Sequence, residues 1–143
     1  MKKEGTILMK YNHQEIAKQH IERKRLFIEF TQSVRSFIEE NDYTGFVLVG
    51  DGFSSIELDI HGYRVVVEFS LEFESEGHPV GIIKCYFEPE LKKRKHFVKY
   101  MFDQLGNIKN KDLSHYNISQ KEGVIGVLIN CADAVVQANL KEA

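Results

Sequence analysis

The chain has 143 residues, of which 43% are hydrophobic and 28% are charged, and its net charge is −2. This composition excludes an intrinsically disordered chain, and the length fits a single domain over residues 1–143. The pI of about 6.3 disfavours a dedicated nucleic-acid-binding protein, because such proteins are usually basic overall.

Residues 12–41 are predicted to form a long helix. Asn12 suits the N-cap position, and Glu15 three residues later completes a capping box. Apolar residues at helical spacing are sparse in the first half of this segment and dense in the second. We therefore expect the second half to pack on the core, and the first half to project past it or to contact a partner.

Four strands are predicted next, over residues 43–49, 53–60, 63–74 and 81–88. The turns between them are short, as at Gly50-Asp51-Gly52 and His61-Gly62, so neighbouring strands should be antiparallel. The third strand alternates most clearly, with an apolar residue at every second position. The first is apolar at consecutive positions, so we expect it inside the sheet.

Residues 91–105 have two interpretations. An apolar stripe from Leu91 to Leu105 fits a helix, and Pro89 suits the start of one. The alternation of apolar residues over 96–103 instead favours a fifth strand. We expect the helix and keep the strand as the alternative.

A long loop over 107–118 is predicted to lead into a last helix over 119–140, which opens with a capping box at Ser119. This helix is apolar nearly all round, so it should be buried on more than one side, by the first helix or by a second subunit. Gly123 and Gly126 would allow the covering element to come close.

These elements predict a two-layer α+β fold. A four-stranded antiparallel meander, or a five-stranded one under the alternative, has one apolar face covered by the long N-terminal and C-terminal helices. The order of helix, meander and closing helix resembles that of bacterial secretion chaperones and toxin-immunity proteins. The resemblance includes no shared motif, so it assigns no residue roles.

Charge is segregated along the chain. Basic residues outnumber acidic ones by eight to four in residues 1–36 and by nine to five in 92–143, whereas residues 37–91 hold two basic and twelve acidic residues. The pattern fits internal complementarity, self-association or docking of a charged partner. The interaction candidates are His20, Arg23, Lys92, Lys93, Arg94, Lys95, Lys99, Glu57, Asp59, Glu68 and Glu72.

The sequence shows no catalytic or metal-binding constellation, and we predict no cofactor and no metal. The six histidines lack the spacing of a zinc helix, and the outward carboxylates of the sheet are expected to be solvated. Cys85 and Cys131 are expected to be reduced core thiols. For a ligand pocket, the candidates are His61, Tyr86 and His115.

Three functions remain open. The favoured one is a non-enzymatic, homodimeric protein-interaction module of the adaptor, chaperone or immunity type. The second is nucleic-acid binding through the basic cluster over 92–99, with Arg23 to Arg25 and the interleaved aromatic residues. The third is a small-ligand-binding protein or minor enzyme with a pocket between sheet and helices.

We expect a cytoplasmic protein that does not contact a membrane. The apolar run near the N-terminus has only three residues, from Ile7 to Met9, which is too short for a signal peptide. No apolar stretch of the sequence is expected to reach the length of about 20 residues that a membrane span needs.

Overall fold

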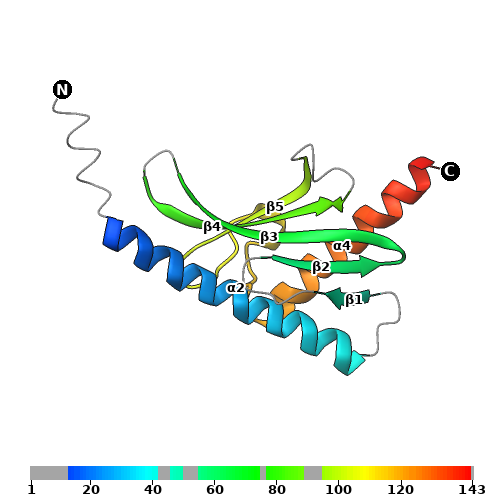
Figure 1. The fold of residues 1–143 in the computed structure, drawn as a ribbon, viewed down its shortest axis with the longest axis horizontal. Helices are drawn as coiled ribbons and strands as arrows, with labels where there is room; N and C mark the ends of the chain where they lie inside the picture. Colours follow the sequence, from blue (N-terminus) through cyan, green and yellow to red (C-terminus); the bar gives the residue numbers. More distant parts are fainter. Residues whose placement is uncertain (1–12, 42–45, 50–54, 75–76, 89–94, 143) are drawn as a thin grey trace.

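The computed structural model describes residues 13–41, 46–49, 55–74, 77–88 and 95–142. Within these ranges the chain forms two long helices, a short 3-10 helix and one five-stranded sheet (Figure 1). The elements are α2 (His13–Asn41), β1 (Phe46–Val49), β2 (Ser55–Ile60), β3 (Tyr63–Phe73), β4 (Pro79–Phe87), β5 (His96–Phe102), η1 (Lys111–Leu113) and α4 (Lys121–Glu142).

The sheet is an antiparallel meander in which the strands lie side by side in the order in which they occur in the chain. This confirms the predicted α+β fold, and the fifth strand of the alternative is present. The helix expected over 91–105 is wrong, because His96–Phe102 pairs with β4 from Gly81↔Phe102 to Tyr86↔His96. A strand here satisfies the second edge of β4 with a hydrogen-bond ladder, which a helix could not do.

One face of the sheet is apolar because every second residue of each strand points to it. The register places Val67 of β3 between Ile56 of β2 and Cys85 of β4, and Cys85 next to Val98 of β5. This inward face includes the buried residues Ile56, Leu58, Ile60, Val65, Val67, Phe69, Ile83, Cys85, Tyr100 and Phe102.

Both helices cover this inward face. The ring of Phe27 in α2 stacks on Phe69, with centroids 5.6 Å apart. In α4, Sγ of Cys131 lies 3.8 Å from Sγ of Cys85. Phe69 and Cys85 lie on the same side of the sheet, so α2 and α4 belong to one layer, as predicted.

The segment between β5 and α4 protects the outer edge of β5. The amide of Lys109 donates to the Met101 carbonyl at 2.8 Å. The Asn110 side chain accepts from the Met101 amide at 2.8 Å and donates to the Lys99 carbonyl at 2.7 Å. An edge satisfied in this way offers little to another strand.

The start of α4 differs slightly from the prediction. The helix begins at Lys121, and the Ser119 hydroxyl hydrogen-bonds Oδ1 of Asn117 at 2.6 Å, so it does not form the expected capping box. Gly126 does allow a close approach, because a Cβ there would lie 3.0 Å from the Leu113 side chain. The covering element at this glycine is therefore the loop before α4.

The expected interior position of the first strand is wrong, because β1 pairs only with β2 and lies at the edge of the sheet. A meander leaves its first strand at an edge.

Some predicted features lie outside the described ranges: the N-cap Asn12, residues 43–45 and the turn at residues 50–52.

Gly81 offers a test of the packing between β4 and β5. It pairs with Phe102, and a Cβ at Gly81 would overlap the Phe102 ring. We expect Gly81→Ala to lower the free energy of unfolding by about 1–3 kcal/mol through overpacking, measured by urea denaturation. Ser70→Ala on the outward face of β3 is the control, expected within about 0.5 kcal/mol of the wild type. Equal losses in the two variants would contradict this packing.

Candidate functional site

The outward face of the sheet carries the acidic residues predicted as docking candidates, and several of them are neutralised within the fold. Glu72 is paired with Lys99 at 3.0 Å and with Lys84 at 3.2 Å. Glu57 is paired with Arg64 at 2.7 Å. This face is therefore a network of paired charges rather than an open acidic surface.

The remaining acidic candidates are placed differently. Oδ1 of Asp59 accepts a hydrogen bond from the Gly62 amide at 3.0 Å and so supports the β2–β3 turn. Glu68 lies opposite Lys84 in the register, and the described residues give it no ion pair.

The pKa of the Glu72 carboxyl is lowered below its ordinary value of 4.5, and the largest cause is the hydrogen bond that Lys99 donates to it.

Beneath these charges, the outward face of β3 and β4 is apolar. Val66, Val80, Ile82 and Tyr86 are all buried there. The Tyr86 ring meets the His96 ring edge-on, with centroids 6.1 Å apart. Long Lys and Arg side chains can cover apolar surface with their stems while their charges stay in water, which explains why this face combines burial with charge.

The basic candidates do not form one free patch. Arg23 is only 3% exposed, and its guanidinium donates to the Pro79 carbonyl at 3.1 Å, so it joins α2 to β4. Burial lowers the pKa of Arg23. The His20 ring contacts the Phe69 ring at a tilt, with centroids 5.5 Å apart. Of the cluster over 92–99, Lys92, Lys93 and Arg94 lie outside the described residues, Lys95 is exposed, and Lys99 is ion-paired.

The three residues predicted to line a ligand pocket lie in separate places. His61 is in the β2–β3 turn, with a positive φ of 51°. His115 follows η1 in the loop after β5, and the register puts that loop at the opposite end of the sheet. Tyr86 is 3% exposed on the outward face. The structure does not bring these residues together.

The two cysteines are buried, free and in contact with each other, as expected for core thiols. The hydrogen bond with Cys131, followed by burial, raises the pKa of the Cys85 thiol. A thiol with a raised pKa and no access to solvent is a poor nucleophile.

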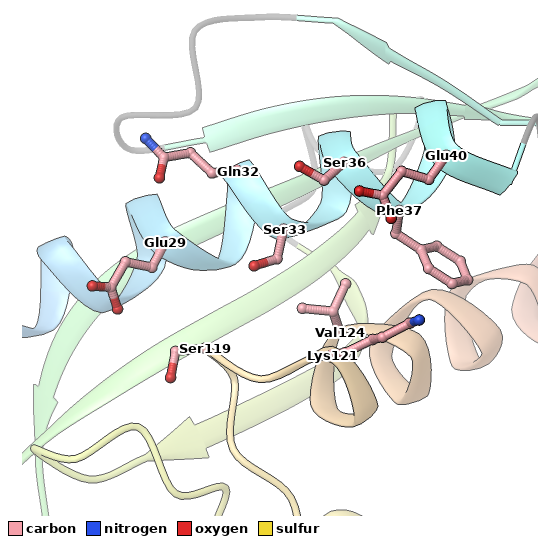
Figure 2. A pocket seen from close by; sticks show the side chains of 9 residues that line it. All are labelled: Glu29, Gln32, Ser33, Ser36, Phe37, Glu40, Ser119, Lys121 and Val124. Carbon is pink, nitrogen blue, oxygen red and sulfur yellow. The ribbon is translucent and has the colours of Figure 1, made fainter.

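A groove of about 500 Å³ lies between α2 and the start of α4 (Figure 2). From α2 it is lined by Glu29, Gln32, Ser33, Ser36, Phe37 and Glu40, and from the other side by Ser119, Lys121 and Val124. Figure 2 shows Phe37 reaching from α2 towards α4, and Glu29 and Glu40 at the two ends of the α2 row. Phe37 and the buried Val124 make the apolar part of the lining.

The carboxylates of the groove, like Glu68 of the sheet, have no partner among the described residues. Among the described residues, Glu29 and Glu40 make no ion pair or hydrogen bond, in contrast to Glu57 and Glu72. The sequence analysis missed this site. The signal was present in α2 as polar residues at helical spacing, with small serines between two glutamates.

A second surface lies on α4. Three of its large apolar residues are exposed: Ile129 at 53%, Val136 at 48% and Leu140 at 65%. The all-round apolar helix is thus covered on its core side and uncovered on another.

By length and composition, Lys121–Leu140 is also able to cross a membrane, so the expectation that no stretch approaches such a span is wrong for this helix. A third of that stretch is buried inside the fold. A core helix of a soluble protein passes the same test of length and composition.

Comparison with protein-family models, with curated proteins and with solved structures finds no match to this chain. The proposals below therefore rest on the groove and on the exposed face of α4.

The paired carboxylate Glu72 predicts a pH dependence of stability. The pKa of Glu72 is lowered in the folded protein, so its ionised carboxylate stabilises the fold above pH 4.5. This stabilisation is lost as the pH falls through the pKa that Glu72 has in the folded protein. We expect Glu72→Gln to reduce the free energy of unfolding at pH 7 by up to about 1 kcal/mol, because the pair is partly screened by solvent. The gap from the wild type should close well below pH 4.5.

Urea denaturation at several pH values measures this gap. Glu68→Gln removes a carboxylate from the same face and is expected to track the wild type throughout. A Glu72→Gln gap that does not change with pH would show that the carboxylate charge is not the cause.

Proposed function

We propose that this protein is a non-enzymatic interaction module that binds a segment of another protein in the groove between α2 and α4. The observation that carries the proposal is the position of Glu29 and Glu40, which pair with no other described residue, at the ends of a groove that is lined in part by Phe37 and Val124. Charge without an internal partner among the described residues, at the rim of a groove of this size, favours binding over a purely structural role.

The charges of α2 indicate the chemistry of the partner. Glu40 lies in the last turn of the helix, where the helix dipole is negative, and this turn contains no basic residue. Placing a carboxylate there is unfavourable for the isolated helix, whereas it attracts an external cation. Lys121 on the opposite wall adds one positive charge to the lining, against the two negative charges of Glu29 and Glu40. A segment with Lys or Arg side chains therefore complements the α2 wall.

The geometry indicates how those cations are spaced. Glu29 and Glu40 are eleven residues apart, which is about 16 Å along a helix axis. Ser33 and Ser36 between them are small, so they leave room for side chains above Phe37 and Val124. The groove thus fits a basic amphipathic helix whose two cations lie about three turns apart, with apolar residues between them on the same face.

A synthetic helical peptide tests this chemistry. It carries two lysines eleven positions apart, with leucines between them on the same face, and its binding is measured by fluorescence anisotropy at low salt. We expect binding that the double variant Glu29→Gln/Glu40→Gln weakens about 3- to 10-fold, because each exposed ion pair contributes up to about 1 kcal/mol. Ser36→Arg, which fills the groove and cancels its net negative charge, should weaken binding further.

The matched control is Asp59→Asn/Glu68→Gln, which removes two carboxylates from the outward face of the sheet and should bind like the wild type. Loss of binding in this control, with retention in the groove variants, would move the docking surface to the sheet. The same groove and control variants can be used to test whether a partner captured from a lysate binds in the groove. Only a partner that the groove variants lose and the control retains supports the proposal.

A further inference from the structure

We infer that a second copy of this chain covers the exposed face of α4, with the two α4 helices packed antiparallel about a two-fold axis. The α4 stripe consists of Ile125, Ile129, Ala132, Val136 and Leu140. Its three exposed members are the residues that nothing in the described fold covers. This surface is separate from the partner groove, and the inference does not depend on the groove.

The spacing of the stripe is that of a helix–helix contact. Successive members are four, three, four and four residues apart, so they stay on one side of the helix over about four turns. Single exposed apolar residues are common on protein surfaces, but an aligned row marks an interaction site. The core side of α4 is formed mainly by other residues, including Val127, Cys131 and Val135, and the partly buried Ala132 at the margin of the stripe also packs against the core.

The stripe is self-complementary when the second helix runs in the opposite direction. With the two-fold axis next to Ala132, Ile129 faces Val136 of the second copy, and Ile125 faces Leu140 of the second copy. Large residues then meet at the outer layers, and the small Ala132 lies at the crossing point, where two helices come within about 8–10 Å. The antiparallel arrangement also brings opposite ends of the two helix dipoles together.

A lipid bilayer is the other partner that an apolar helix face could meet, and the described residues favour it less. To span a membrane, α4 would have to leave the core, where Cys131 and Val135 are fully buried. A helix lying on a membrane surface usually has basic residues beside its apolar face. The exposed residues that flank this stripe are Lys121 and Asn139 on one side and Glu122 and Asp133 on the other, so its described flanks are more acidic than basic.

Light scattering of the full chain after gel filtration tests the inference. We expect a mass of twice the 16.6 kDa of one chain. Ile129→Asp and Val136→Asp should raise the dissociation constant of the dimer at least about 100-fold, because each places an unpaired charge in the interface. Gln137→Asp adds the same charge to α4 away from the stripe and should remain dimeric. All three sites are exposed, so circular dichroism should show an unchanged fold.

Disulfide trapping tests the antiparallel register. When chains with Ile125→Cys are mixed with chains carrying Leu140→Cys, a mixed disulfide should form faster than either homodimeric one. The inference also makes Asp133 of the two copies neighbours near the axis, so Asp133→Asn should tighten the dimer by relieving repulsion.

Three results would overturn the inference: a wild-type monomer, a dimer that survives Ile129→Asp, or a monomer that binds vesicles of anionic phospholipid through the same stripe. Glu29→Gln/Glu40→Gln should leave the mass unchanged. A failure of the groove proposal is thereby distinguished from a failure of this one.

Discussion

The structure depends on the need to cover one apolar face of a five-stranded sheet. Five strands spaced about 4.8 Å apart are about 19 Å across, and a helix with its side chains is about 10 Å wide. Two helices side by side are therefore just wide enough to cover the apolar face of the sheet, which is why α2 and α4 lie in a single layer. The groove between them is a result of this arrangement, since it lies where Ser33 and Ser36 of α2 face the start of α4.

The segregation of charge along the sequence is explained in part by internal pairing. Glu72 comes from the acidic middle of the chain, and Lys99 comes from its basic last part, yet the meander places them on the same face, on β3 and β5 at either side of β4, where their side chains pair. Lys109 and Glu74 form another such pair. Each surface pair contributes little to stability, and Lys99 and Lys109 each bring one positive charge from the last part of the chain onto the acidic middle. The carboxylates of the groove stand out because they are not part of this network.

The sequence was most informative where the period of its apolar residues had one interpretation. In β3, alternation from Tyr63 to Phe73 predicted both the strand and its inward face. The apolar residues of 96–102 fitted both the two-residue period of a strand and the 3.6-residue period of a helix. The strand forms because it pairs with β4, which is a tertiary contact. The groove could not be predicted because its volume depends on the angle between two helices. The uncovered face of α4 was predicted as excess apolarity, without its position on the helix.

The contribution of α4 to the core also affects how the chain folds during synthesis. A ribosome produces the meander before it produces α4, and about 40 residues separate the end of β5 from the end of that helix. At typical elongation rates of about 5–20 residues per second, the part of the apolar face around Cys85 is uncovered for several seconds. The loop after β5 emerges in this interval and brings three residues of the core that can shield this part of the apolar face: Ile108, Leu113 and Ile118. The loop that protects the edge of β5 in the finished protein is thus placed in the chain where a nascent sheet most needs a temporary cover.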